Sequence, residues 1–390
     1  MRVRVDAGKF QCYCNDELVF EVEDTRYTSG KVGLAKFRHT TAEFKAFALG
    51  SELPTERADP EIAARVAELV NDIATDRPPR STLIGDVEQT GLAGRHALDD
   101  RARQLERQAQ RLRELSTAVH AQQVRDQIKA ALQPPDGGNG ELLRAALLLA
   151  LLDNDEVDVD FYMQAVQDLA DEFLKSLPAE ISAANRLAAF HRFLFEEQGF
   201  HGARTSYYTA SNSYLNEVLD DREGLPITLA VVYVELAKRV GVDAVGIGLP
   251  GHFVAQSTAD GQSHLIDVFD RGRTMTQAEA MALVATRGVE WSEDYLRPQS
   301  PTEIIVRMLR NLIGVANGAS NAEAALRYTD VILALQPDSV EDRLFKAVLC
   351  YNTRRAEEGL VEADWILERR PEGLVIERVE QLREALEGLK

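Results

Sequence analysis

Alternation of apolar and charged positions at the start of the chain predicts β-strands. Val3 and Val5 alternate with Arg and Asp, and the turn-forming pair Asn15-Asp16 follows the next apolar stretch. Further strand patterns cover residues 10–14, 18–22, 32–37 and 44–49. Residues 1–50 are therefore predicted to form a β-meander.

The region that follows is predicted to be first a linker and then a helix. Residues 51–94 hold four prolines around one short helical pattern, residues 60–73, which indicates a linker with an embedded helix. From Ala97 to Leu132 apolar residues recur every seven positions with Arg and Gln between them, which predicts a long amphipathic helix with a coiled-coil seam. The seam consists of Leu98, Leu105, Leu112 and Val119.

Residues 141–300 combine helices with a small antiparallel sheet. A helix is predicted from Pro226 to Val240, because Pro favours the first helical position and Gly241 provides a stop. Its apolar side holds Leu229, Val232, Tyr233, Leu236 and Ala237. Asp260-Gly261 is a hairpin signal. The other predicted elements are helices at 142–152, 161–177 and 181–197 and strands at 244–248, 252–257 and 264–269.

The last third of the chain contains an internal repeat. "YTDVILALQPD" (328–338) aligns with "EADWILERRPE" (362–372), which places Pro337 on Pro371 at an offset of 34 residues. This period is that of tetratricopeptide units, in which Pro closes the second helix. Two units with a flanking helix at 303–315 are fewer than a free-standing solenoid needs, so we expect them to dock on the middle domain.

The pattern as a whole predicts an α+β protein that is mostly α. Its expected parts are a partial β-sandwich-like meander (1–50), a linker with a long amphipathic helix (51–140), an α+β core with a helical lead-in (141–300) and helical repeats (301–390).

Composition narrows the function further. Lys plus Arg number 44 and Asp plus Glu 63, a formal charge of −19, which argues against a nucleic-acid binder or a membrane-surface protein. Residues 95–129 alone carry 8 basic and 5 acidic side chains. A solvated helix face explains them, and contact with an anion or nucleic acid is the alternative.

The cysteines and the longest apolar run predict the compartment. Cys12, Cys14 and Cys350 cannot form a disulfide framework, which fits a reducing cytoplasm. Residues 145–152, the longest apolar run, are far shorter than the ~20 residues that span a bilayer, and no signal segment precedes them. We expect a cytoplasmic protein that is neither exported nor embedded in a membrane.

Several sequence blocks in the middle of the chain resemble the SirB-type branch of the transglutaminase-like superfamily, over residues 141–385. This resemblance implies a helical lead-in, a reduced transglutaminase-like core and C-terminal tetratricopeptide units. The blocks are "EEQGFHG" (196–202), "NSYLNEVLDDREGLPITLAVVYVELAKRVG" (212–241), "GLPGHFV" (248–254), "IDVFDRG" (266–272) and "RMLRNL" (307–312).

The N-terminal segment "CNDELVFEVEDTRYTSGKVGLAKF" is similar to the closing strands of a concanavalin or laminin-G type sandwich. A sandwich needs two packed sheets, so we expect upstream strands or another chain to cover this one. Such sandwiches often bind sugars, which makes Tyr13, Phe20 and Phe37 either core residues or a sugar platform.

The resemblance to transglutaminase-like enzymes implies a Cys–His–Asp arrangement, with the Cys at the N-terminus of the core helix. The corresponding positions here are Pro226, His252 and Asp267. Proline has no nucleophilic side chain, and the SirB-type pattern "GxPI[ST]L" itself has proline there. A thioester cycle cannot run from position 226.

Two other residues are candidate nucleophiles. Thr228 lies about 200° around the helix from position 226, so local hydrogen bonding near the helix start is the favoured interpretation of its hydroxyl. Cys350 sits in a helix of the repeat beside Leu344 and Val348 and is interpreted as a core residue.

His252 and Asp267 have two interpretations. The pair either fixes the sheet or forms the polar floor of a cleft that suits a peptide or carbonyl ligand. The predicted binding residues of that cleft are Tyr208, Asn212, Tyr214, Asn216, Arg222 and Thr228. For the two asparagines, capping or turn hydrogen bonding is the alternative, and they share one face if 212–219 is helical.

No metal or cofactor is predicted. His264 and Asp267 are three residues apart on a strand and point to opposite faces, so they cannot easily share one ion. The sequence contains no phosphate-binding or dinucleotide-binding motif.

The favoured hypothesis is a non-catalytic protein that binds a protein or peptide through its repeats or its cleft. The alternative is a hydrolase or other enzyme without a thiol, in which His252, oriented by Asp267, acts as general base.

Overall fold

The computed structural model describes residues 2–6, 8–14, 17–23, 81–89, 91–133, 140–205 and 209–390, with isolated positions at 50, 61, 64 and 66. Two compact units, residues 1–115 and 116–390, divide the chain inside its longest helix. Among the described residues no helix combines the length and apolar character needed to cross a membrane.

The first unit contains a three-stranded antiparallel sheet in the order β1 (Arg2–Asp6), β2 (Lys9–Cys14), β3 (Glu17–Glu23). The predicted meander is confirmed over these strands. Val5 pairs with Phe10 and Phe10 with Val22, so one face of the sheet is apolar. The predicted strands at 32–37 and 44–49, Phe37 included, and the Asn15-Asp16 turn lie outside the described residues.

The predicted long helix is confirmed as α3 (Gly91–Leu132), which begins six residues earlier than expected and follows α2 (Ser81–Glu88). The expected seam is not its buried face, because Leu105, Leu112 and Val119 are exposed. Burial occurs instead in the last turns, at Val124, Ile128 and Leu132.

Helix α8 (Pro226–Arg239) is the centre of the second unit. Pro226 occupies its first turn and Gly241, at φ +70°, follows its end, as predicted. The expected apolar side is buried, but so are Ile227, Thr228 and Val231 on other sides. The prediction of an amphipathic helix was therefore wrong: neighbouring elements cover α8 nearly all round.

The helices that precede α8 in the chain lie around it. Residues 142–152 and 181–197 were predicted as single helices, yet each changes hydrogen-bond register in its last turn, to a 3-10 turn (Leu149–Leu152) and a π turn (Arg192–Glu197). The regular helices are α4 (Leu142–Leu148), α5 (Val159–Ser176), α6 (Ala183–His191) and α7 (Leu215–Asp221). A 3-10 turn, Ala210–Ser213, precedes α7.

An antiparallel sheet follows α8 in the order β6 (Asp243–Ile247), β7 (Val254–Ala259), β8 (Gln262–Asp267), β9 (Arg273–Met275). The Asp260-Gly261 hairpin is confirmed: both residues have positive φ, as a type I′ turn requires. Ala255 and Ile266 share the core of α8, whereas Val254 and Met275 pack with residues of α9 (Gln277–Ala285). One helix thus covers each face of the sheet.

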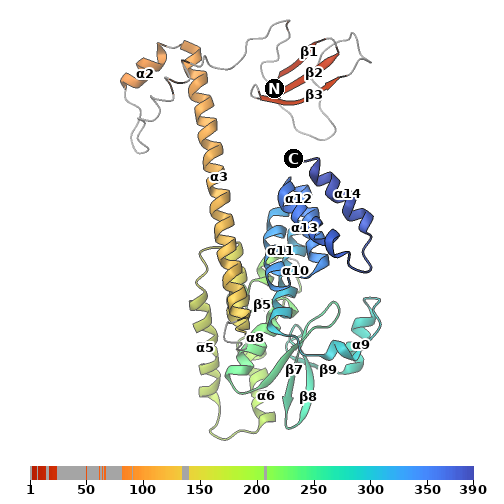
Figure 1. Ribbon diagram of the computed structural model, residues 1–390. Coiled ribbons are helices and arrows are strands. Elements are labelled where there is room, and N and C mark those ends of the chain that lie inside the picture. Colours follow the sequence, from red (N-terminus) through yellow and green to blue (C-terminus); the bar gives the residue numbers. More distant parts are fainter. Residues whose placement is uncertain are drawn as a thin grey trace. The chain divides into compact units, whose positions relative to one another are not determined.

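Antiparallel helices stack in chain order at the C-terminus, drawn in blue in Figure 1. A 3-10 turn, Glu293–Leu296, precedes them, and Ser300 and Glu303 cap the first helix reciprocally. Ile305 and Leu309 of that helix belong to the same core as α4 and α8, so the stack is docked on the middle region. The helices are α10 (Pro301–Gly318), α11 (Ala322–Leu335), α12 (Val340–Asn352), α13 (Ala356–Arg369) and α14 (Ile376–Glu387).

Candidate functional site

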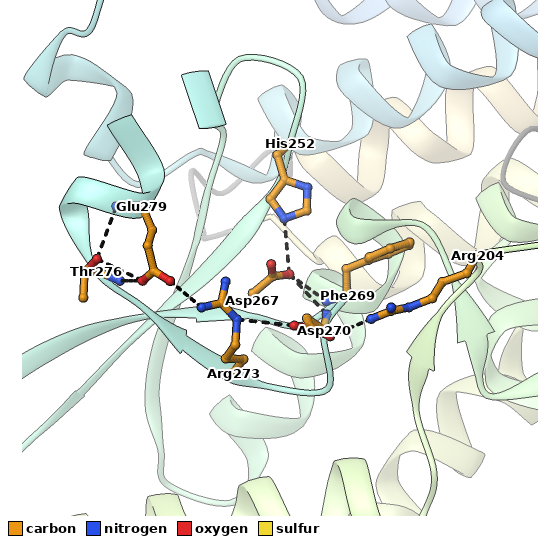
Figure 2. A network of polar contacts seen from close by, with 8 residues as sticks. All are labelled: Arg204, His252, Asp267, Phe269, Asp270, Arg273, Thr276 and Glu279. Carbon is orange, nitrogen blue, oxygen red and sulfur yellow. Dashed lines mark hydrogen bonds and ion pairs between the residues drawn. The ribbon is translucent and has the colours of Figure 1, made fainter. Parts of the chain in front are cut away.

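His252 and Asp267 meet at the carboxyl end of β8, as Figure 2 shows. Nε2 of His252 lies 3.2 Å from Oδ1 of Asp267, and the two side chains are 13% and 10% exposed. The same carboxylate oxygen accepts the backbone N–H groups of Phe269 and Asp270, at 3.2 and 3.3 Å. Asp267 therefore orients the imidazole and is itself held by the turn that follows it.

Burial by itself raises the pKa of Asp267. The hydrogen bond and charge of His252, together with the two backbone N–H groups, outweigh it, and the net pKa lies below the ordinary value. Asp267 is consequently a carboxylate at neutral pH, which suits it to stabilise a protonated partner ring.

His252 does not begin a strand, which corrects the prediction for residues 252–257: β7 starts at Val254. The residue lies in a turn closed by its own N–H, which donates to the carbonyl of Leu249. Arg307 of α10 holds this turn by donating to the carbonyls of Leu249 and His252, at 2.7 and 2.6 Å. Only one ring nitrogen of His252 is used, since Nδ1 has no hydrogen-bond partner among the described residues.

A short parallel bridge connects the start of α8 with this turn region. Strand β4 (His201–Gly202) pairs with β5 (Glu223–Gly224), and Ala203 N–H donates to the carbonyl of Gly224. On its other side Gly202 N–H donates to the carbonyl of Phe269, at 3.1 Å. Residues 201–203 thus hold together the chain just before Pro226 and the chain just after Asp267.

Position 228 does not supply a free hydroxyl. Thr228 is fully buried, and its Oγ1 donates to the carbonyls of Asn212 and Leu225, at 2.9 and 3.1 Å. This agrees with the structural interpretation of Thr228. It also shows how the 3-10 turn at Asn212 is attached to the first turn of α8.

Cys350 does not contribute a thiol to the dyad. Cys350, the one cysteine in the sequence beyond residue 115, is buried in α12 of the C-terminal helices, and burial raises its pKa to about 12. Cys12 lies on β2 of the first unit. The interpretation of Cys350 as a core residue is confirmed.

The residues predicted to wall a cleft have other contacts. Tyr214 separates the 3-10 turn from α7, so Asn212 and Asn216 do not share one helix, and both are buried. The Tyr214 hydroxyl donates to Asp153 at 2.5 Å. Arg222 lies over the ring of Phe200, 4.7 Å from its centroid, and lines a separate 240 Å³ cavity with Tyr162 and Asp220; Tyr208 lies outside the described residues.

A different set of residues lines the cavity next to the dyad. This cavity measures about 490 Å³, and we call it the Phe269 pocket. The ring of Phe269 contributes to its wall and also meets the His252 ring edge-on, with centroids 6.4 Å apart. The remaining side chains of its wall are His201, Arg204, Thr205, Glu223 and Arg271.

Sequence reasoning missed these residues although a signal was present. His201 lies in the block "EEQGFHG", and Phe269 and Arg271 lie in "IDVFDRG", two of the blocks that carry the family resemblance. Arg204 donates a hydrogen bond to Asp270 at 2.6 Å, and Asp270 also forms an ion pair with Arg273. Arg273 in turn forms an ion pair with Glu279 (Figure 2). Backbone hydrogen bonding of the Glu279 carboxylate with Thr276, aided by Arg273, lowers the pKa of Glu279 to about 2.

Within the described ranges, no three His, Cys, Asp or Glu side chains gather in a way that would hold a metal ion. His264 is exposed on β8 and lines a 290 Å³ groove beside α6, away from the carboxylate of Asp267. At the dyad, His252, which Asp267 orients, can transfer a proton or form a hydrogen bond.

Comparison with known proteins gives consistent relatives for this region. Residues 160–310 match the transglutaminase-like superfamily. A UPF0162 protein of Xylella fastidiosa (strain 9a5c) is 36% identical over 212 residues, which cover 52% of this chain and 75% of the relative. One from Pseudomonas aeruginosa is 30% identical over 222 residues, 56% of this chain and 79% of the relative.

A more distant likeness reaches animals. Human F-box only protein 21 is 25% identical over 266 residues, covering 60% of this chain and 42% of that protein. No solved structure matches the chain.

Proposed function

Because this chain belongs to the family of the UPF0162 proteins and carries a transglutaminase-like domain, we propose that it uses this frame to bind a peptide segment of another protein. Thiol acyl transfer is not part of the proposed function. The binding place is the surface around His252 and the Phe269 pocket.

One observation carries this proposal: the dyad is kept and held in place while the nucleophile position is proline. Arg307, the turn at Leu249 and the carboxylate of Asp267 all fix His252. Pro226 occupies the place where the resemblance puts a thiol. A polar group that is positioned this carefully next to a 490 Å³ cavity suits recognition of a peptide backbone or side chain.

The test is selection of short peptides from a phage-displayed random library against the full chain. Each selected peptide is then added to the full chain while the ring signals of His252 and His264 are followed by NMR and the peptide mass is monitored. We expect the His252 signals to shift, the His264 signals on the opposite side of β8 to stay, and the peptide to remain intact. Bound peptides that leave His252 unchanged would remove the proposal.

A second candidate is a hydrolase in which His252 acts as general base on a water molecule. Two features favour it: Nδ1 of His252 has no hydrogen-bond partner in the described part of the chain, and the carboxylate of Asp267 orients the ring. It makes the opposite prediction for the same experiment, since peptides would be cleaved by the wild type and not by His252→Gln. Mass spectrometry of the peptides therefore separates the two functions.

We also propose the finer family assignment, to the SirB-type branch with tetratricopeptide units. Helices α11 and α13 begin 34 residues apart, at Ala322 and Ala356, which supports the repeat. A concanavalin-like sandwich in the first unit, with its sugar platform, stays a prediction. The cytoplasmic location and the absence of nucleic-acid, membrane, metal and cofactor partners also remain predictions.

A further inference from the structure

The Phe269 pocket contains two opposite charges that the described protein leaves unpaired. Arg271 has no hydrogen bond or ion pair among the described residues, and neither does the carboxylate of Glu223. Both residues nevertheless line the same 490 Å³ cavity. The pocket's other arginine, Arg204, is already neutralised by Asp270 at 2.6 Å.

The backbone holds both residues in place. Glu223 is in register with His201 in the β4–β5 bridge, directly before α8. Arg271 lies in the turn after Asp267 with φ +51°, a conformation that a residue with a side chain adopts at some cost in energy. Residues 201–203 form backbone hydrogen bonds with Phe269 on one side and with Gly224 on the other. The segments that carry Arg271 and Glu223 are therefore both held by residues 201–203.

A ligand that carries one charge of each sign would complete this arrangement. Charge-assisted hydrogen bonds are the strong ones, and a guanidinium recognises a carboxylate through two parallel donors. Glu223 would oppose an anion that has no cationic group of its own. The volume accommodates two or three side chains but not a folded domain.

We propose that the Phe269 pocket recognises a peptide segment that presents a carboxylate to Arg271 and a cationic group to Glu223. This rests on the proposed peptide-binding function and specifies its ligand. The two charges can come from neighbouring acidic and basic side chains or from the ends of a free short peptide, and the test separates these sources.

The test uses pentapeptides with blocked ends in four compositions, in which two positions carry Lys and Glu, Gln and Glu, Lys and Gln, or Gln and Gln, the three mixed pairs in both orders. Affinity for the full chain is measured by calorimetry. We expect the Lys/Glu peptides to bind about tenfold more tightly than either singly charged set, which corresponds to about 1.4 kcal/mol. Free Lys-Glu dipeptides, compared with their blocked forms, report binding through the peptide ends.

Two variants complete a double-mutant cycle. Arg271→Asn should weaken the Lys/Glu peptides to the level of the Lys/Gln peptides and leave peptides without Glu unchanged. Glu223→Gln should remove the preference for Lys in the same way. Arg354→Asn is the matched control, because Arg354 is also exposed and at positive φ (+58°) but belongs to the C-terminal repeats.

Equal affinity of the wild type for all four peptides would overturn the proposal. So would an equal weakening of all four peptides by Arg271→Asn. If one of these two results is found while peptides selected from the library still shift the His252 signals, the proposed peptide binding stands and only this inference is overturned. If no peptide of either experiment binds, both fall.

Discussion

Gly202 and Phe269 are in direct contact: the ring of Phe269 lies where a side chain at position 202 would be. A Cβ built on Gly202 would come within 2.4 Å of the ring, and the two residues also share a backbone hydrogen bond of 3.1 Å. Phe269 in turn separates His252 from the pocket that bears its name. The absence of a side chain at Gly202 therefore sets the position of the Phe269 ring between the dyad and the pocket.

Replacing this glycine should disturb both stability and the pocket. Gly202→Ala forces the ring of Phe269 to move, and such overpacking costs about 1–3 kcal/mol of unfolding free energy. Urea denaturation measures the loss, and the His252 ring signals should shift as Phe269 moves. Gly314→Ala in α10 is the control, because nothing lies within 4 Å of its Cβ and alanine favours a helix. Equal unfolding free energies for Gly202→Ala and Gly314→Ala would contradict the close contact between Gly202 and the ring of Phe269.

A polar cluster around Asp153 joins the short helices of the core to the C-terminal stack. Its carboxylate accepts hydrogen bonds from Tyr214, Arg327 and Tyr328, at 2.5, 2.6 and 2.6 Å. Burial raises the pKa of both tyrosines, which stay neutral donors at any ordinary pH. The carboxylate is the common acceptor for all three.

Removing that acceptor should loosen the stack. Asp153→Ala leaves Arg327 and two hydroxyls without their partner, and we expect a loss of about 2–4 kcal/mol in unfolding free energy. Hydrogen exchange should accelerate in α11 first, since Arg327 and Tyr328 belong to it. Asp160→Ala, which removes an 81% exposed partner of Arg144, should cost less than about 1 kcal/mol. Unchanged exchange in α11 would show that the cluster does not hold the stack.

Local signals predicted much of the fold and less of the site. The start and stop of α8 at Pro226 and Gly241 depend on neighbouring residues alone, and so does the Asp260-Gly261 turn; both were predicted correctly. The dyad of His252 and Asp267 was found through family resemblance and is confirmed as a contact.

The pocket could not be predicted because its wall comes from segments far apart in sequence. Arg204 and Asp270 are 66 residues apart, and tertiary contacts such as the backbone hydrogen bonds of β4 bring their segments together. Tyr214 was assigned to a cleft by its residue type. Its hydroxyl turns to Asp153 instead, because the chain changes direction at the end of the 3-10 turn.

Acid should destabilise the protein through His191. Burial lowers the pKa of this histidine to about 4 from an unfolded value of 6.5, and its Nε2 shares a hydrogen bond with the Tyr233 hydroxyl at 2.8 Å. The unfolded chain thus takes up a proton more readily than the folded one. The contribution to stability is complete above pH 6.5 and is lost as pH falls toward 4, by about 3 kcal/mol in all.

A comparison with a variant that cannot titrate isolates this contribution. His191→Gln keeps an acceptor for Tyr233, so its unfolding free energy should fall by about 2 kcal/mol less than that of the wild type between about pH 7 and pH 5. Other groups, such as Asp267, titrate in both proteins and cancel. Parallel pH dependence of the two proteins would mean that the folded protein takes up a proton at His191 as readily as the unfolded chain does.

The assignment of position 226 can be tested by restoring the missing atom. Pro226→Cys puts a thiol in the first turn of α8, where the helix end favours the thiolate. If position 226 faces the dyad, iodoacetamide should modify this thiol quickly near neutral pH, and His252→Ala in the same protein should slow the reaction. Thr228→Cys is the matched control, because positions 226 and 228 are both buried in the first turn of α8 and only the side chain at 228 is directed at two carbonyls.

Peptide mapping by mass spectrometry measures each site separately, so Cys12, Cys14 and Cys350 do not interfere. We expect the thiol at 226 to react at least about tenfold faster than the thiol at 228, in line with its larger thiolate fraction. A thiol at 226 that reacts as slowly as the one at 228, and that reacts no more slowly when His252→Ala is added, would contradict a nucleophile position at 226. The presence of proline at position 226 would then say nothing about function. The role of His252 would have to be inferred from its contacts with Asp267 and Phe269 alone.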